Sequence, residues 1–178
     1  AFQLPGSFTK AGSVTPPACP MVVTGSITPT VANITAAIQY RPQDVGTTGS
    51  VYVFALAPQT LVPNAVVAGK HLGPMTNATA TDAPLACVLA QLTSSGQLTA
   101  ASAGSLQAYL TGVLGSQGAS INVLNGVSTA LIQGSVFYVG YGANSTAMMN
   151  GGINRSAVTV PGTQTCQPQA PETGWWWN

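Results

Sequence analysis

Val51-Tyr52-Val53-Phe54-Ala55-Leu56 is a run of apolar and aromatic residues, and it decides the fold class of this chain of 178 residues. The run Val136-Phe137-Tyr138-Val139 has the same character. β-Branched and aromatic residues favour strands, and a strand without polar alternation is typically covered on both faces. We therefore expect both runs to be central strands. A neighbouring subunit would cover their second face, unless the tyrosines stand on an outer face with ordinary scattered apolar exposure.

From about Met21 the chain consists of short strand-like runs separated by turn residues. Val, Ile, Thr, Tyr and Leu dominate the runs, and Gly, Pro, Asn and Ser lie between them. Strands spaced by roughly 8–12 residues are typical of an antiparallel sandwich or barrel. We predict an all-β fold, an antiparallel β-sandwich or a barrel-like variant of it, with strands near Met21–Ile27, Ala32–Tyr40, Ser50–Ala57, Leu85–Leu92, Leu106–Leu114, Ser120–Leu124, Ser128–Ile132, Val136–Tyr141 and Ser156–Val160.

Glycine-containing pairs predict the tight turns. Asn125-Gly126 lies between two strand-like runs and supplies the positive φ angles that a type I′ hairpin needs. Asn150-Gly151-Gly152 is a second turn candidate. Residues Ala100–Leu114 are rich in Ala, Ser, Leu and Gln, but Gly104 and Gly112 weaken a helix there. We predict a strand with a turn in that segment.

Proline separates the two ends of the chain from the central domain. Prolines interrupt residues 1–20 and predict an extended N-terminal arm. Residues 21–160 predict the β-sandwich domain, and residues 161–178 a Pro- and Trp-rich C-terminal tail. The tail ends with Trp175-Trp176-Trp177-Asn178, and each Trp side chain can bury roughly 150–250 Å². We expect a partner surface, or the chain's own flank, to hold the tail.

Charge is scarce throughout the sequence. Charged residues make up 4% of the chain and the formal net charge is +1, whereas soluble domains carry about 25% charged residues. A surface with so little charge favours self-association, and it has no basic patch for a nucleic-acid partner. The chain has no apolar run of about 18–20 residues that would predict a transmembrane segment. Its beginning lacks the features of a secretory signal, as expected of a mature exported chain.

Candidates for catalysis and metal binding are few. A triad of His71, the single histidine, with Asp44 or Asp82 lacks a G-x-S-x-G nucleophile elbow. The carboxylates Asp44, Asp82 and Glu172 are scattered and match neither a glycosidase pair nor a calcium loop. Gly140-Tyr141-Gly142 does not complete a dinucleotide-binding fingerprint and is interpreted as a turn after a central strand. We predict no enzyme activity, no metal and no cofactor.

The three cysteines match no zinc or redox spacing. Cys19 and Cys166 lie just outside the two ends of the core, and we expect a Cys19–Cys166 disulfide that ties the tails together. Cys87 lies in an apolar run and is expected to be a small buried hydrophobe. A disulfide favours an extracellular location. The N-glycosylation pattern occurs at Asn33, Asn77, Asn144 and Asn154.

Two short motifs resemble a known class of protein. Tyr52-Val53-Phe54-Ala55-Leu56 has the form YVxAL, and Tyr138-Val139-Gly140-Tyr141-Gly142 has the form YVGYG, with Met148-Met149 shortly after it. In these motifs the chain from about Met21 to Pro161 resembles β-rich modules of secreted and surface proteins of proteobacteria. The resemblance implies export and a β-module without enzymatic activity. It transfers no catalytic residue.

These observations predict a secreted structural subunit, located extracellularly at the cell surface, that self-assembles into a filament, sheath or surface layer. Its partner is another copy of itself, joined through the terminal arms by strand addition and apolar burial. The alternative is an extracellular carbohydrate-binding or adhesive module, with a polysaccharide partner and Trp and Tyr faces that stack on sugars. The side chains expected to drive assembly are Phe2, Leu4, Phe8, Trp175, Trp176 and Trp177.

Overall fold

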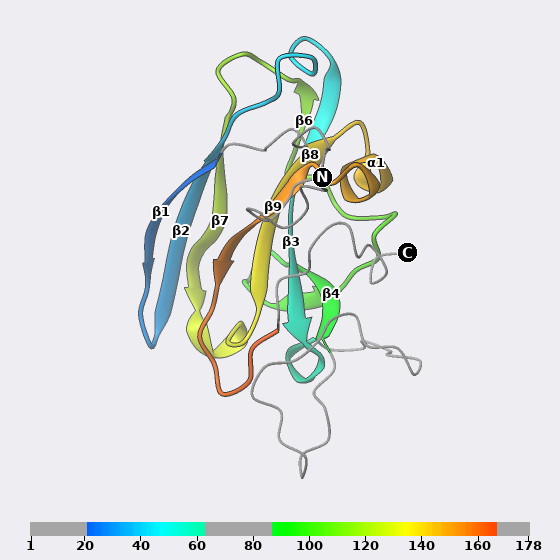
Figure 1. Cartoon of the computed structure of the whole chain (residues 1–178). Helices are drawn as coiled ribbons and strands as arrows, with labels where there is room; N and C mark the ends of the chain where they lie inside the picture. Colours follow the sequence, from blue (N-terminus) through cyan, green and yellow to red (C-terminus); the bar gives the residue numbers. More distant parts are fainter. Residues whose placement is uncertain (1–20, 63–86, 167–178) are drawn as a thin grey trace, which may run out of the picture.

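The computed structural model describes residues 21–62 and 87–166, which form two antiparallel β-sheets packed face to face (Figure 1). The main core lies between the sheets and contains apolar side chains from both of them. The predicted antiparallel β-sandwich is confirmed.

The smaller sheet has three strands, in the order β1 (Met21–Ile27), β2 (Val31–Ile38) and β7 (Ala119–Ser128). Its central strand, β2, alternates between buried and exposed residues. Successive strand residues point to opposite faces of a sheet, so one face of this sheet joins the core. The other face of β2 is open to solvent.

The larger sheet has six strands, which are β3 (Thr48–Pro58), β4 (Cys87–Leu92), β5 (Leu98–Ala100), β6 (Leu110–Val113), β8 (Val136–Gly142) and β9 (Asn154–Thr159). β3 and β8 pair at its centre, and β9 lies beyond β8. On its other side, β3 pairs with β6 near its start and with β4 near its end. β5 pairs with β4 at the edge.

The two apolar runs are the paired central strands β3 and β8, and both are buried on both faces, as predicted. One face of each strand joins the main core. The other face forms a second apolar cluster that includes Tyr52, Phe54 and Leu56 of β3 with Val136 and Tyr138 of β8. The rings of Phe54 and Tyr138 stack across the strands, with centroids 5.2 Å apart. Both faces of the larger sheet therefore contribute buried apolar area.

The second cluster is covered by the chain itself. Met148 and Met149 of helix α1 (Ser145–Gly151) and Leu106 of the segment 101–106 belong to this cluster and are buried. The expectation that a neighbouring subunit covers this face is wrong. The alternative of an exposed tyrosine face is wrong too, because the tyrosines of this cluster are at most 4% exposed.

One serine joins the two covering segments. The hydroxyl of Ser145, in the first turn of α1, donates a hydrogen bond to the carbonyl oxygen of Ala103. The Oγ atom of Ser145 also accepts a hydrogen bond of 3.2 Å from the N–H of Leu106. The helix and the segment 101–106 are therefore held together over the outer face of β3 and β8.

The predicted Asn125-Gly126 hairpin is wrong. β7 continues through both residues and pairs with β2 along the whole of β2, with a register shift at Asn33. Gly126 does have a positive φ, 63°, but its N–H donates a hydrogen bond of 2.8 Å to Asn33 Oδ1. A β-bulge and a tight hairpin both use residues with positive φ, which explains the error. The chain after β7 forms the 3₁₀ turn Thr129–Leu131 instead of the predicted strand Ser128–Ile132.

Helix α1 was not predicted from the sequence. It begins after Asn144, whose side chain accepts a hydrogen bond of 2.8 Å from the N–H of Ala147. It ends at Gly151 and is followed by Gly152, which has the left-handed conformation common after helices. The predicted turn Asn150-Gly151-Gly152 is therefore the end of a helix. Gly140-Tyr141-Gly142, predicted as a turn after a strand, belongs to strand β8 itself.

The glycines of β8 let α1 pack directly against the strand backbone. A Cβ atom at Gly140 would lie 2.7 Å from Met148 Sδ, and one at Gly142 would lie 2.9 Å from the backbone nitrogen of Met148. Real Cβ atoms essentially never approach other atoms so closely. The glycines of the YVGYG motif and Met148 of α1 therefore pack directly against each other.

The remaining elements differ from the predictions mainly in length. β6 covers only part of the predicted strand Leu106–Leu114, and the short strand β5 was not predicted. The prediction that Ala100–Leu114 contains no helix is confirmed. A second 3₁₀ turn, Gln59–Leu61, follows β3.

Candidate functional site

Two of the charged side chains in the described residues form an ion pair on the loop after β2. Arg41 Nε lies 2.5 Å from Asp44 Oδ2. The hydroxyl of Tyr141, on β8, donates a hydrogen bond of 2.6 Å to the same carboxylate oxygen and accepts one of 2.9 Å from the N–H of Arg41. The Tyr40 ring meets the Tyr141 ring edge-on, with centroids 4.9 Å apart. These contacts attach the loop to the larger sheet.

The pKa values of Arg41, Asp44 and Tyr141 indicate a structural contact rather than a catalytic one. Partial burial alone raises the pKa of the Asp44 carboxyl, but hydrogen bonds from Arg41 and Tyr141 outweigh burial and keep this pKa below its ordinary value. The hydrogen bond to Asp44 is the main cause that raises the pKa of Arg41. Burial, and then the hydrogen bond to Asp44, raises the pKa of Tyr141 to about 12. General acid–base catalysts need a pKa near the working pH, and these groups have moved away from it.

The structure does not test the triad considered from the sequence. His71 and Asp82 lie outside the described residues, as does Glu172. Asp44, the remaining candidate, is engaged by Arg41 and Tyr141. Within residues 21–62 and 87–166, no group of three or more His, Cys, Asp or Glu could hold a metal ion.

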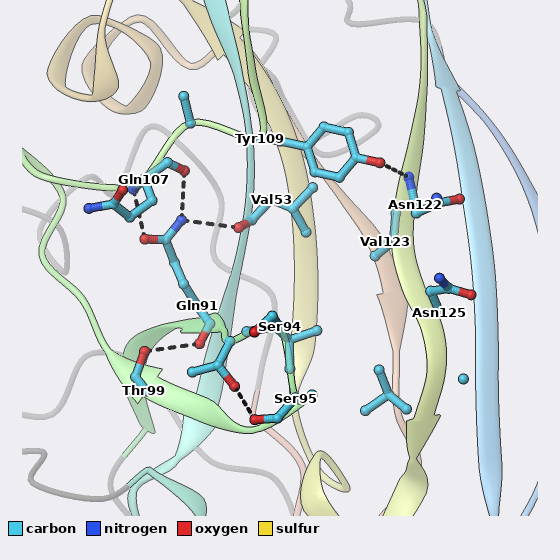
Figure 2. A pocket seen from close by; sticks show the side chains of 16 residues that line it. Val53, Gln91, Ser94, Ser95, Thr99, Gln107, Tyr109, Asn122, Val123 and Asn125 are labelled. Atoms are coloured by element: carbon cyan, nitrogen blue, oxygen red, sulfur yellow. Dashed lines mark hydrogen bonds between the residues drawn. The ribbon is translucent and has the colours of Figure 1, made fainter.

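A groove of about 770 Å³ lies between β7 of the smaller sheet and the hairpin formed by β4 and β5 (Figure 2). Residues 107–109 contribute to the same lining. The lining contains amide and hydroxyl side chains together with apolar surface from Val53, Val123 and Val127. None of the described residues that line it is charged. The groove is therefore a neutral site of mixed polarity.

The side chain of Gln91 organises one wall of the groove. Along β3, the pairing with β6 ends at Val51 and the pairing with β4 begins at Ala55. Gln91 Nε2 donates to the carbonyl oxygen of Val53, within this interval, at 3.4 Å. It also donates to the carbonyl oxygen of Gln107 at 2.9 Å, and Gln91 Oε1 accepts from the N–H of Gln107 at 2.8 Å. One side-chain amide thus joins β3 and the segment around Gln107 to β4.

Tyr109 connects this wall to β7. Its side chain reaches toward β7 (Figure 2), and its hydroxyl oxygen accepts a hydrogen bond of 3.1 Å from the N–H of Asn122. Among the described strands β7 pairs with β2 alone, so Tyr109 occupies a backbone donor on the free edge of β7. A tyrosine hydroxyl that accepts one hydrogen bond can still donate its own proton. The side chain of Tyr109 is 43% exposed and accessible from the groove.

The opposite edge of the smaller sheet is formed by β1, which is mostly exposed and contains Gly25 with a positive φ of 127°. All seven residues of β1 pair with β2 without a register shift. Val22 is 65% exposed and Val23 is 39% exposed. Natural proteins protect edge strands with charges, prolines or bulges. β1 has no charged residue and no proline, so its outer edge is unprotected by these devices.

The residues predicted to drive assembly lie outside the described residues. This applies to Phe2, Leu4 and Phe8 of the N-terminal arm and to Trp175, Trp176 and Trp177 of the tail. The described structure begins with β1 at Met21, directly after the predicted arm. β1 is therefore the described element that directly follows the predicted arm in the sequence.

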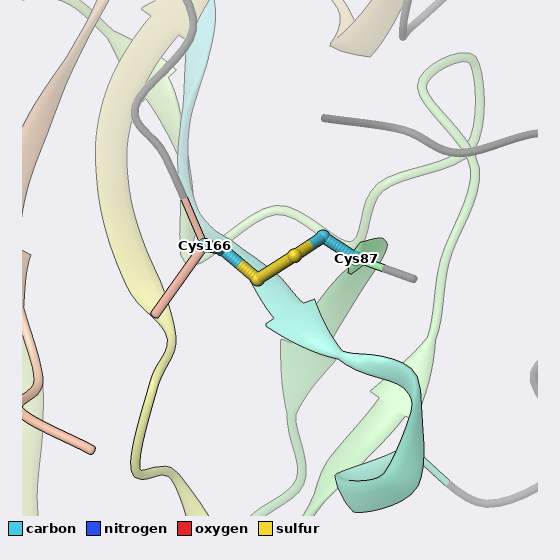
Figure 3. Close-up of a disulfide and its surroundings, with 2 residues drawn as sticks. All are labelled: Cys87 and Cys166. Carbon is cyan, nitrogen blue, oxygen red and sulfur yellow. A yellow bond between two sulfur atoms is a disulfide. The ribbon is translucent and has the colours of Figure 1, made fainter. Parts of the chain in front are cut away.

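The disulfide of the described structure joins Cys87 to Cys166 (Figure 3). The Cα atoms are 6.1 Å apart and the residues are separated by 79 positions. The predicted Cys19–Cys166 pairing is wrong, and Cys87 is buried as half of a disulfide. The pairing of Cys87 with Pro58 of β3 and the hydrogen bond from the Cys166 N–H to Gly134 O position the two cysteines. Cys19 lies outside the described residues.

The N-glycosylation patterns differ in accessibility. Asn33 and Asn144 are exposed, although the Oδ1 atom of each accepts a backbone hydrogen bond. Asn154 is 1% exposed, and its Nδ2 donates to the carbonyl oxygen of Met148 at 3.4 Å. Attachment at Asn154 is therefore incompatible with the folded domain. Asn77 lies outside the described residues.

Sequence reasoning did not identify the groove. Its polar side chains come from the β4–β5 hairpin, from β7 and from the segment between β5 and β6, and no short motif connects them. The one local signal is Gln91, a polar residue that interrupts an otherwise apolar strand. A buried or half-buried amide in such a run must find hydrogen-bond partners, but the sequence does not show which ones.

Within the described part of the chain, no helix is long and apolar enough to cross a membrane. In comparisons with known proteins, no protein family, no curated protein and no solved structure matches this chain.

Proposed function

We propose that this chain is a secreted structural subunit that self-assembles into an extracellular filament, sheath or surface layer. The observation that carries the proposal is the edge of β1 with which no other described strand pairs, and which is uncharged, without a register shift and partly apolar. Such an edge is a template for another strand. In this mechanism the N-terminal arm of one copy adds as a strand to the β1 edge of the next copy.

The composition of the arm suits a donated strand. Phe2, Leu4 and Phe8 occupy even positions, and alternate residues of an extended strand share one face. The donor segment and the acceptor edge are different surfaces of the same chain, so the contact is head-to-tail and propagates unless its rotation closes a ring. The tryptophans at 175–177 add apolar burial to the same assembly.

Two further features support an extracellular assembly. The disulfide between Cys87 and Cys166 is compatible with an oxidising compartment. The described surface has almost no charge to oppose close packing of copies: its charged residues are Arg41, Asp44 and Arg155, and the first two are paired with each other.

The first experiment compares the purified full chain with two assembly variants by sedimentation velocity and negative-stain electron microscopy. We expect polymers from the parent chain. Deletion of residues 1–18 removes the donor strand, and replacement of Trp175, Trp176 and Trp177 by Ser removes the apolar tail, so both variants should remain monomeric. A parent chain that stays monomeric, or normal polymers from both variants, contradicts the proposal.

A matched pair of lysine substitutions tests the edge itself. Val22→Lys places a charge on the β1 edge, and Ala37→Lys places the same charge on its exposed neighbour in the middle strand β2. Charged residues on edge strands oppose strand addition, so V22K should block assembly while A37K should assemble. Equal assembly of the two variants would show that the edge of β1 is not the contact.

A further inference from the structure

We propose that the groove between β7 and the β4–β5 hairpin is a binding site for a neutral oligosaccharide. A volume of about 770 Å³ falls within the usual range of small-ligand sites, roughly 300–1,000 Å³. The groove lies on the opposite edge of the smaller sheet from β1. It is therefore independent of the contact proposed for self-assembly.

The chemistry of the lining selects for a neutral ligand. Among residues 21–62 and 87–166, no lysine, arginine, histidine, aspartate or glutamate lines the groove, so an anionic ligand such as a phosphate finds no charge-assisted partner in this lining. The polar groups are hydroxyls and amides, including Thr99, Gln107 and Asn125. Amides and hydroxyls can both donate and accept hydrogen bonds, as the hydroxyl groups of a sugar do.

The apolar part of the lining suits the other face of a sugar ring. Val53 and Leu92 are half-buried and contribute aliphatic surface, and Tyr109 contributes an exposed ring. A pyranose ring carries C–H groups on its faces and hydroxyls at its rim, so it matches a site that combines aliphatic, aromatic and amide groups. An aromatic ring with a polar tip provides both kinds of contact in one side chain.

The polar groups of the site are partly held in place before a ligand arrives. Three hydrogen bonds fix the amide of Gln91 between Val53 and Gln107. The hydrogen bond from Asn122 fixes the hydroxyl of Tyr109 and leaves its proton available to donate. Side chains that are already ordered lose less entropy on binding. Both N–H groups of Gln91 are used in these bonds, so Gln91 shapes the wall, and the hydroxyl of Tyr109 is the fixed group that can donate to a ligand. Asn125 lines the same groove.

An extended peptide is a poorer occupant for this groove. Adding a strand to β7 requires a regular row of free backbone donors and acceptors. The pairing of β7 with β2 contains two register shifts, and bulges disturb an edge as a template. In addition, Tyr109 already takes the N–H of Asn122. β1, which has neither feature, is the better acceptor for a strand.

The experiment is isothermal titration of the full chain with neutral pentasaccharides of glucose, mannose, galactose and N-acetylglucosamine. Polygalacturonate serves as the anionic comparison, and a synthetic peptide of residues 1–20 represents the peptide class. We expect at least one neutral pentasaccharide to bind. Tyr109→Ala and Asn125→Ala should each weaken its binding by about tenfold or more, as expected when a central contact is removed.

Two control variants show whether the sugar binds in this groove or elsewhere on the chain. Gln39→Ala removes an exposed amide that does not line the groove and should leave binding unchanged. Replacement of Trp175, Trp176 and Trp177 by Ser should also leave it unchanged if the sugar is held by the described lining of the groove. Circular dichroism and thermal melting confirm that each variant is folded.

The proposal is overturned if none of the four neutral pentasaccharides binds at millimolar concentration, or if the groove variants bind as well as the parent. It is also overturned if binding disappears in the tryptophan variant alone, or if the peptide of residues 1–20 binds and is weakened by Tyr109→Ala. V22K should lose assembly but still bind the sugar. The two proposals can therefore fail independently of each other.

Discussion

The hydroxyl of Tyr141 donates a hydrogen bond of 2.6 Å to Asp44 Oδ2, although the two residues are 97 positions apart in the sequence. This contact joins the central strand β8 to the loop after β2, and Arg41 completes it from the same loop. Because Tyr141 has a pKa of about 12, it remains a donor at neutral pH. The cluster therefore links the loop after the smaller sheet's strand β2 to the larger sheet.

Asp44→Asn should lower stability in a pH-dependent way. The pKa of Asp44 is lower in the folded chain than its ordinary value of 3.8, so its contribution is present above pH 3.8 and is lost as the pH falls through the folded pKa. We expect D44N to be less stable than the parent by about 1 kcal/mol at about pH 6. The difference should shrink at about pH 2.5, as measured by urea unfolding. A difference independent of pH would contradict the proposed role of the carboxylate.

Removing the disulfide should destabilise the domain strongly. The bond closes a loop between residues separated by 79 positions, and the loop-entropy relation gives up to about 4.5 kcal/mol for that length. The double variant Cys87→Ala with Cys166→Ala should therefore unfold at a much lower urea concentration than the parent. Cys19→Ala is the matched control and should unfold like the parent. Equal stability of the parent and the double variant would exclude a structural role for the bond.

Two buried serines should respond in opposite directions to replacement by alanine. The Ser145 hydroxyl bonds to Ala103 and Leu106, so Ser145→Ala should cost about 1–3 kcal/mol because it breaks both bonds. The Ser135 hydroxyl is buried without a hydrogen-bond partner among the described residues. Ser135→Ala should leave stability unchanged or raise it by about 1 kcal/mol. Thermal melting of both variants measures the contrast, and a large loss in S135A would show that its hydroxyl has a partner.

Gly140→Ala should loosen the packing of α1 on β8. The added methyl group would lie 2.7 Å from Met148 Sδ and from Asn154 Cβ, and such overpacking costs about 1–3 kcal/mol. Gly112→Ala, on β6, is the control, because a Cβ there meets nothing within 4 Å. Urea unfolding should separate the two variants clearly. If G140A is as stable as G112A, the helix does not need the close approach.

The central strands could be predicted because their signal is local. β-Branched and aromatic residues without polar alternation define β3 and β8 wherever their partners lie, and the first strand, Met21–Ile27, was predicted with its observed bounds. The Asn125-Gly126 error has the opposite cause. The pair Asn125-Gly126 favours a positive φ at Gly126, which is 63° in the structure. Whether this φ makes a hairpin or a bulge depends on the neighbouring strand β2, where Asn33 accepts the Gly126 N–H and a bulge forms.

The groove could not be predicted, because no local sequence pattern connects the residues that line it. Gln91, Tyr109 and Asn122 lie on three different segments. Gln91 stands out as a polar residue in an apolar strand, but nothing in the sequence links it to the other two. Their hydrogen bonds exist only after β4 and β7 have taken their places in different sheets. The same is true of the disulfide, since Cys87 meets Cys166 only across the folded larger sheet.

By itself, the sequence determined that this chain is an all-β protein with two central strands buried on both faces and a surface almost free of charge, because composition and strand periodicity act locally. Only the tertiary structure decided what covers the outer face of β3 and β8, which cysteines pair, which sheet edge pairs without a register shift and where the groove lies. Those properties depend on contacts between distant segments, and the free energy of such contacts is realised only when backbone pairing and side-chain packing are formed together.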